Sequence, residues 1–348
     1  MSTNRRIYLD FNATSPLSEV AAAAMAGVLA GGVLGNPSSI HQEGRGARDL
    51  VERARDVVAR LVGRAREHVV FTSGGTEANR LGIEILVGGR DVTVEVGGME
   101  HPSLTGRRAG TGRAVVVGVG AVNHELGTIA DLDAIVAEAH ARGALVHVDA
   151  VQATGKLDLA PIAAIADTMA ISAHKIGGPQ GVGALVIADP DRVPVREDGH
   201  QERGRRGGTE NVVGIVGFGA AAAAVDVADW ARVRALGERF EAAILAAVAG
   251  TRVHGADRPR VGGVVNVGFA GARGDAVVIA LDLAGVAAST GSACTSGSVE
   301  PSTVLLALGE PPERAREAVR FSLGRTTTTD ELESVVALLP AIVARARR

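Results

Sequence analysis

Lys175 is the side chain with the clearest capacity for chemistry, because it is one of only two lysines in the chain. Arginine supplies 34 of the 36 basic residues (36 minus Lys156 and Lys175), and a guanidinium cannot serve as an amine nucleophile because it does not deprotonate. Lys175 follows a short apolar run ending at Ile171 and precedes a glycine-rich segment, 177–183. A lysine after a buried strand, in a loop of small residues, indicates a Schiff-base lysine, since desolvation favours the neutral amine. A solvated loop lysine is the alternative interpretation.

A candidate phosphate site lies at residues 73–77, which read Ser-Gly-Gly-Thr-Glu between an expected strand and an expected helix. Backbone amides at the start of a helix, together with the Thr76 hydroxyl, make a site suited to an anion. The alternative is an ordinary N-terminal helix cap. Ser172 and His174 place two hydrogen-bonding side chains beside Lys175. These two side chains are suited to forming further hydrogen bonds to a phosphate.

Asp149 ends an apolar strand, and a buried carboxylate needs a cation or several donors. A protonated pyridine nitrogen would meet this need, and such an aspartate is the expected partner of pyridoxal phosphate. The alternative is a helix-capping aspartate. His101 offers an imidazole that could lie on a flat ring or move protons, although taken alone its position favours a structural loop histidine. Together these residues predict a phosphate cradle, a ring-nitrogen acid, a ring-face histidine and an amine on successive strand ends.

The composition excludes several other classes of protein. The chain has 348 residues, a net charge of −3 and 22% charged residues, which argues against a general nucleic-acid or membrane surface. A single cysteine, Cys294, rules out an intramolecular disulfide, and no metal site is expected. There is no apolar run long enough to span a bilayer and no signal-peptide pattern at the N-terminus, so a cytoplasmic location is expected.

Strands and helices alternate through the first two thirds of the chain, which predicts an α/β fold with a mostly parallel sheet. Active sites in such sheets lie at the carboxyl ends of the strands, where the candidate residues fall. The character of the chain changes after a long alanine-rich helical region, 212–249. We therefore expect a large domain of residues 15–230 and a smaller α+β domain of residues 1–14 and 231–348.

The chain resembles the cysteine desulfurases, pyridoxal-phosphate enzymes related to the class V aminotransferases. The motifs are specific as a set and span nearly the whole chain. The resemblance implies fold type I of the pyridoxal-phosphate-dependent transferases, with a large-domain sheet of the seven-stranded type. The segments that carry it are 8–16, 35–41, 73–79, 100–101, 147–152, 172–183, 201–211, 289–296 and 319–325.

The resemblance also implies roles for particular residues. Lys175 would carry the cofactor as a Schiff base, and His101 would stack on the ring and shuttle protons. Cys294 would be the nucleophile that takes sulfur from L-cysteine as a persulfide and leaves alanine. The remaining roles are Asp149 on the ring nitrogen, Gln152 on the ring hydroxyl, Gly75, Thr76, Ser172 and His174 on the phosphate, Thr209 on the phosphate of the partner subunit in a homodimer, and Asn36 and Arg320 on the substrate carboxylate.

The chain departs from the family pattern at three places. His124 stands where the family has the second asparagine of an Asn-Asn-Glu triplet, and the segment between His101 and Asn123 is short, as if a helix and a strand were missing. The residues 198–200 read Asp-Gly-His, where relatives have a glycine run.

Three functions remain open from the sequence. The leading hypothesis is a cysteine desulfurase that passes sulfur to an acceptor protein, for example for iron–sulfur assembly, without binding nucleic acid or membrane. The second keeps the cofactor and changes the substrate, as in a selenocysteine lyase or an aminotransferase-like enzyme. The third is a non-catalytic adaptor derived from the same fold, which the short segment and His124 motivate.

Overall fold

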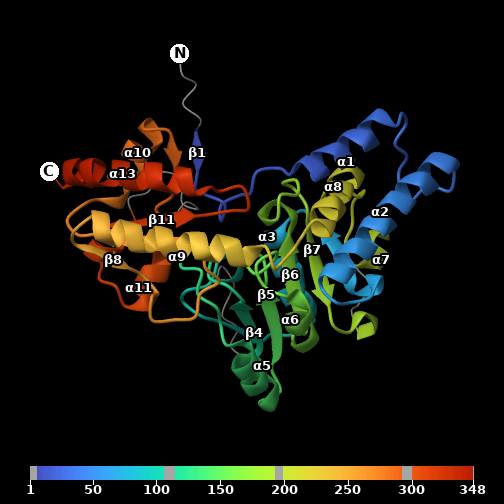
Figure 1. Ribbon diagram of the computed structural model, residues 1–348. Helices are drawn as coiled ribbons and strands as arrows, with labels where there is room; N and C mark the ends of the chain where they lie inside the picture. Colours follow the sequence, from blue (N-terminus) through green and yellow to red (C-terminus); the bar gives the residue numbers. More distant parts are fainter. Residues whose placement is uncertain (1–5, 106–113, 193–198, 292–299, 348) are drawn as a thin grey trace. The chain divides into compact units, whose positions relative to one another are not determined.

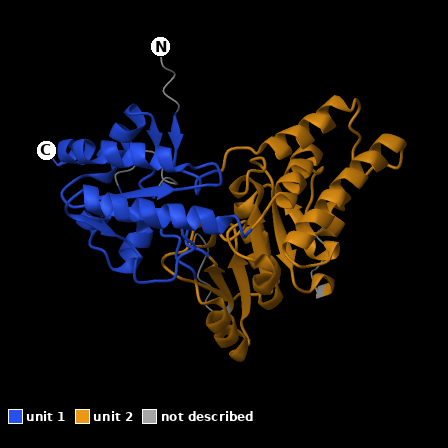
Figure 2. Cartoon of the chain, in the orientation of Figure 1, with its two compact units in different colours: residues 1–14, 122–129, 227–348 blue, residues 15–121, 130–226 orange. Residues whose placement is uncertain are grey.

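The computed structural model describes residues 6–105, 114–192, 199–291 and 300–347. The chain divides into two compact units, coloured separately in Figure 2: unit 2 is residues 15–121 and 130–226, and unit 1 is residues 1–14, 122–129 and 227–348. No sequence pattern indicated that residues 122–129 belong with unit 1. The division into domains of residues 15–230 and of residues 1–14 with 231–348 stays a prediction. No helix in the described ranges combines the length and the apolar character needed to cross a bilayer.

Unit 2 is built on a sheet of six described strands in the order β2-β7-β6-β5-β4-β3 (Figure 1). Three of the strand pairs are parallel, whereas β7 runs antiparallel to both of its neighbours. The prediction of an α/β fold with a mostly parallel sheet is therefore confirmed. The strands are β2 (Val69–Thr72), β3 (Thr93–Val96), β4 (Ala114–Gly120), β5 (Leu145–Asp149), β6 (Thr168–Ser172) and β7 (Gly183–Ile187).

The described sheet has six strands instead of the expected seven. The described residues of the short segment between His101 and Asn123 hold helix α4 (Pro102–Thr105) and strand β4. The residues 106–113 within it lie outside the described ranges.

Helices cover the sheet of unit 2. Helix α3 packs along the central strands β5, β6 and β7, and helices α1, α2 and α8 pack together beside them (Figure 1). All residues of β6 and β7 are buried, as expected for strands covered on both faces. The helices are α1 (Glu19–Ala30), α2 (Gln42–Leu61), α3 (Gly75–Val87), α5 (Leu132–Ala141), α6 (Leu159–Ile165), α7 (Gln201–Gly204) and α8 (Val212–Ala223), with short 3₁₀ turns η1 (Arg66–His68), η2 (Ala173–Lys175) and η3 (Pro190–Arg192).

Unit 1 is α+β, with a three-stranded antiparallel sheet in the order β11-β9-β8 and a separate parallel pair, β1 with β10. Its core includes an edge-to-face contact of Phe240 with Phe321, whose ring centroids lie 5.4 Å apart. Thr328 and Glu331 form a capping box at the start of the last helix. The elements are β1 (Ile7–Tyr8), α9 (Trp230–Ala247), β8 (Thr251–Val253), β9 (Val264–Phe269), α10 (Gly274–Leu283), β10 (Val286–Ala287), α11 (Thr303–Leu308), α12 (Pro312–Ala315), β11 (Ala318–Ser322) and α13 (Thr329–Ala346).

Residues 122–129 interrupt unit 2 in the sequence but belong to unit 1, and we call them the excursion 122–129. They form hydrogen bonds to residues of unit 1 that come much later in the chain. Ile129 N donates to Pro259 O at 2.8 Å, and Asn266 Nδ2 donates to Glu125 O at 3.2 Å. At its base, Ala130 N donates to Ala121 O at 3.1 Å, so the chain leaves and re-enters unit 2 at neighbouring points.

Candidate active site

Lys175 lies at the carboxyl end of β6, on the single 3₁₀ turn η2. Ser15, the first residue of unit 2, holds two carbonyl groups of that turn. Its Oγ donates to Lys175 O at 2.8 Å, and its N donates to His174 O at 2.9 Å. The loop then folds back through a bond from Gly178 N to Ala173 O at 2.9 Å. The lysine backbone is thus held on a fixed turn at the sheet edge where the sequence predicts the site.

The start of α3 forms the expected cradle for an anion. Its N-cap is Gly74, whose φ of 154° favours glycine, and no side chain caps the helix. A Cβ on Gly75 would lie 2.6 Å from Val151 Cγ2, so only glycine lets the helix start come this close to the strand ends. The ordinary side-chain cap considered from the sequence is therefore not what the structure shows, and the first N–H groups of α3 are left for a ligand.

Ser172 and His174 provide the other side of this cradle. Ser172 is 1% exposed, and its Oγ has no hydrogen-bond partner among the described residues, which is costly unless a ligand supplies one. The side chain lies close to the cradle, since a Cβ on Gly75 would be 3.6 Å from Ser172 Cβ. Burial, followed by the positive charge of Lys175, lowers the pKa of His174 to about 4, so this imidazole is neutral at pH 7.

Asp149 is buried at the end of β5, and donors reach both of its carboxylate oxygens. Val151 N donates to Oδ1 at 2.9 Å, and Asn79 Nδ2 donates to Oδ2 at 2.6 Å. Gln152 is buried as well, and Lys156 Nζ donates to its Oε1 at 2.9 Å. The second lysine of the chain is thus a structural partner of a predicted cofactor-binding residue.

The charges of the predicted residues act on one another within unit 2. Burial lowers the pKa of His101, nearby Asp149 opposes this shift, and Lys175 lowers the pKa further. The structure therefore brings His101, Asp149, His174 and Lys175 into one cluster, as expected from their positions at strand ends.

Glu100 is a half-buried acid beside this cluster, which the sequence indicated only as the neighbour of His101. Burial raises its pKa to about 7, against the lowering effect of a 2.7 Å hydrogen bond from Gly120 N, and nearby Asp149 raises it further. Because the folded state holds this proton more tightly than the unfolded state, the stabilisation is complete below pH 4.5 and is lost as pH rises through 7.

We therefore expect Glu100→Gln to leave stability unchanged at pH 4.5 and to raise it at pH 8, by up to about 3 kcal/mol. Glutamine keeps an acceptor for Gly120 N and never ionises. Urea unfolding of both proteins across this range measures the difference, with exposed Glu313→Gln as the control. A variant that gains nothing above pH 7 would contradict the raised pKa of Glu100.

The segment 200–211, which carries Thr209, is anchored to unit 2 at two points. Glu202 forms a buried bidentate ion pair with Arg55, at 2.5 Å and 2.9 Å, and also accepts from Phe71 N at 2.8 Å. Arg206 Nε donates to Glu77 Oε1 at 2.8 Å, so this loop is bonded directly to the first turn of α3. These contacts hold the segment although Glu202 (φ 48°) and the next residue (φ 58°) adopt the left-handed conformation that favours glycine.

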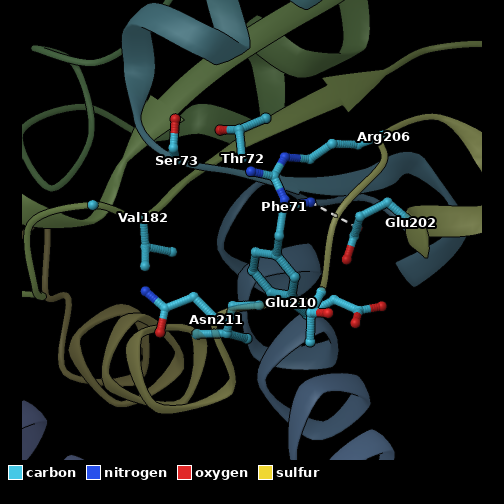
Figure 3. A pocket seen from close by; sticks show the side chains of 11 residues that line it. Phe71, Thr72, Ser73, Val182, Glu202, Arg206, Glu210 and Asn211 are labelled. Carbon is cyan, nitrogen blue, oxygen red and sulfur yellow. Dashed lines mark hydrogen bonds between the residues drawn. The ribbon is translucent and has the colours of Figure 1, made fainter. Parts of the chain in front are cut away.

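A small cavity of about 60 Å³ lies between this segment and the strand end that precedes the phosphate cradle (Figure 3). Ser73, Arg206 and Thr209 are among the residues that line it. Thr209 is itself exposed. It therefore lies near the cradle without being enclosed in it.

Three other predicted residues belong to other segments of the chain. Asn36 is exposed in the loop between α1 and α2, where its Oδ1 accepts from Ser38 N at 2.9 Å. Arg320 belongs to unit 1, where it pairs with Asp10 at 2.6 Å and donates to His124 O at 3.1 Å. Cys294 lies outside the described residues.

Two residues of the site were not identified from the sequence. Asn79 is 1% exposed and bonds to Asp149, and Ser103 Oγ lies 2.7 Å from His101 Nδ1. A polar residue on the buried face of α3 was the only local signal for Asn79, and it does not by itself indicate a partner 70 residues away.

Comparison with known proteins agrees with this geometry. The model of the family "Aminotransferase class-V" matches residues 7–109 and 107–335. "Cysteine desulfurase 2" of Trichormus variabilis is 37% identical over 377 residues, which cover 98% of this chain and 94% of the relative. The chain therefore belongs to the class V aminotransferase family and, within it, to the cysteine desulfurases. It is accordingly a pyridoxal-phosphate-dependent enzyme.

Solved structures show the same fold. The NifS-like protein from Rickettsia africae superposes with a TM-score of 0.86 at 25% identity, over 97% of this chain and 99% of that one. A structure described as SspA in complex with cysteine superposes with a TM-score of 0.78 at 26% identity, over 92% of this chain and 100% of that one. The expectation of a pyridoxal-phosphate fold is thereby confirmed.

The residues present fit the cofactor. The partnerless Ser172 hydroxyl and the uncapped start of α3 match a phosphate, and the buried Asp149 carboxylate matches a protonated ring nitrogen. Lys175 places an amine at the same sheet edge.

Proposed function

We propose that this enzyme converts L-cysteine to L-alanine and transfers the sulfur to Cys294 as a persulfide, for delivery to an acceptor protein. The observation that carries the proposal is the cluster of Lys175, Asp149 and His101 beside the uncapped start of α3. The desulfurases it resembles, and a related structure described as a complex with cysteine, support the choice of substrate.

The phosphate and ring of the cofactor are assigned to residues of unit 2. The N–H groups of Gly75 and Thr76, with Ser172 and His174, bind the phosphate. Because the folded protein keeps His174 neutral, this residue acts as a hydrogen-bond donor and not as a counter-ion. Asp149 and Gln152 bind the ring nitrogen and the ring hydroxyl, with Gln152 held by Lys156. When bound, pyridoxal phosphate supplies an electron sink next to the amino acid carbon.

Lys175 would hold the cofactor covalently through its amine. His101 would stack on the ring and shuttle protons; burial lowers its pKa, so that the imidazole is neutral at pH 7. Asn36 and Arg320 bind the substrate carboxylate, since the arginine fork suits a carboxylate.

Cys294 performs the sulfur transfer. Its thiolate attacks the sulfur of the substrate, so that an S–S bond forms as the carbon–sulfur bond breaks and the electron pair passes to the carbon. A proton then replaces the sulfur and gives alanine. The sum is L-cysteine plus one thiol giving L-alanine plus one persulfide, with no external oxidant.

We expect Cys294→Ala to form no protein-bound persulfide from L-cysteine while still binding the cofactor. Alanine, sulfide and persulfide are measured after incubation with L-cysteine, by amino acid analysis and by alkylation with mass spectrometry. Ser334→Ala, an exposed serine on α13, is the control. Unchanged turnover of L-cysteine in Cys294→Ala would favour the alternative of a selenocysteine lyase or another enzyme of this cofactor class.

The assembly and location are also part of the proposal. Thr209 reaches the cofactor phosphate of a partner subunit, which makes the enzyme a homodimer; its exposure and its anchored segment are consistent with this role. A single cysteine that must stay reduced suits the cytoplasm. Iron–sulfur assembly is one destination of the sulfur.

A further inference from the structure

A chain of hydrogen bonds joins Asp149 to His101 through Asn79 and Ser103, two residues of unit 2. Asn79 Nδ2 lies 2.6 Å from Asp149 Oδ2 and 2.7 Å from Ser103 Oγ. Ser103 Oγ in turn lies 2.7 Å from His101 Nδ1. Asn79 is 1% exposed and Asp149 8%, so the bond between these two residues lies in surroundings of low dielectric, where a bond is stronger and its loss costs more.

Asn79 can adopt only one orientation of its amide. As a carboxylate, Asp149 can only accept, so the amide nitrogen must face it. Asn79 Oδ1 then accepts from His147 Nε2, 2.9 Å away. The other ring nitrogen of His147 lies 2.9 Å from Thr168 Oγ1. The fully buried His147, protonated on Nε2, thereby holds Asn79 in place.

The same logic assigns the proton of His101. Ser103 N lies 3.1 Å from His101 Nδ1, and a backbone N–H can only donate, so Nδ1 carries no proton. Ser103 Oγ already accepts from Asn79 and donates its own hydrogen to the same nitrogen. Neutral His101 therefore has its proton on Nε2.

We propose that Asn79 and Ser103 are positioning residues of the desulfurase: they orient the Asp149 carboxylate and hold His101 in the Nε2-protonated form, so that neutral His101 presents Nε2–H as its proton donor. Only the catalytic consequence rests on the proposed function. The tautomer is a property of the protein itself and is tested separately.

The tautomer is read from the ring ¹⁵N resonances of the holoenzyme, labelled at histidine, with His101→Gln to assign the signals. We expect Nδ1 of His101 to resonate as an unprotonated nitrogen and Nε2 as a protonated one. In Ser103→Ala, His101 Nδ1 loses the hydroxyl bond and keeps the bond from the backbone N–H of residue 103. The ¹⁵N shifts of both ring nitrogens of His101 should then move toward the average of the two tautomers. A wild-type protein with a protonated Nδ1 would overturn the proposal.

The catalytic consequence is measured on the same variants. Ser103→Ala should lower kcat about 10-fold with little change in KM, and Asn79→Leu should weaken pyridoxal phosphate binding about 10-fold in an absorbance titration. In the double variant the loss in kcat should not exceed that of Asn79→Leu alone, because both residues act through one chain. Ser103→Ala keeps the proposal testable if Asn79→Leu does not fold.

Thr154→Val is the matched control, since its buried hydroxyl donates to Ala150 O at 2.8 Å outside the chain of bonds. It should leave kcat, cofactor binding and the His101 signals unchanged. Wild-type kcat together with wild-type His101 signals in Ser103→Ala would refute the role of Ser103. A wild-type enzyme that shows the Nε2 form and makes no alanine would contradict the proposed function and still support the tautomer.

Discussion

Replacing Lys175 with alanine is expected to abolish covalent attachment of the cofactor and to lower the turnover of L-cysteine by at least about 10⁴-fold. The reason is chemical, because no other residue on η2 offers an amine, and the only other lysine donates to Gln152 Oε1. The measurements are the absorbance of the purified protein, the mass of peptides after borohydride reduction with pyridoxal phosphate, and alanine formation.

Two further variants show whether charge or nucleophilicity matters at this position. Lys175→Arg keeps the positive charge that lowers the pKa of His101 and His174, but cannot form the covalent link, and it should be as inactive as alanine. Lys156→Arg is the control, which should still carry the reduced cofactor on the peptide that contains residue 175. Reduced cofactor found on Lys156 of the wild-type enzyme would contradict the assignment.

The largest effect on stability is expected at the buried ion pair of Arg55 and Glu202, whose side chains are 4% and 1% exposed. Arg55→Met would leave the Glu202 carboxylate buried with Phe71 N as its remaining described donor. Breaking one side of such a pair costs about 3–5 kcal/mol, which corresponds to a fall in Tm on the order of 10 °C. Chemical denaturation and calorimetry of the holoenzyme measure it.

A double variant separates the cost of an unpaired charge from the loss of packing. In Arg55→Met with Glu202→Met no buried charge remains, and we expect part of the lost stability to return. The control is Arg80→Met, which breaks a pair with Glu84 in which the arginine is 71% exposed and should cost under about 1 kcal/mol. If the double variant were less stable than Arg55→Met alone, the energetic account of this pair would be wrong.

Local sequence patterns predicted most of the elements because their signals lie within a few residues. Helix α5 lies in the region of alternating strands and helices, and the capping box of α13 needs only Thr328 and Glu331, three residues apart. Helix α6 and strand β8 were missed, because a seven-residue helix with an internal proline and a three-residue strand carry too little periodicity.

The site was predicted best where the chemistry of one residue was decisive. Lys175, Asp149 and His101 each follow a strand, and strand ends of one sheet must meet. Asn79 and Ser103 could not be predicted in the same way, since their roles come from bonds between segments distant in the chain. The left-handed backbone at Glu202 is likewise invisible in the sequence, because Arg55, 147 residues earlier, helps to hold it.

The excursion 122–129 affects how the chain folds during synthesis. This segment leaves the ribosome well before Pro259 and Asn266, to which it bonds. At 5–20 residues per second, translation of the intervening stretch takes on the order of ten seconds. During that time unit 2 can complete its sheet before these two bonds can form. An N-terminal fragment ending at residue 226 would lack Pro259 and Asn266, and a circularly permuted gene would change the delay.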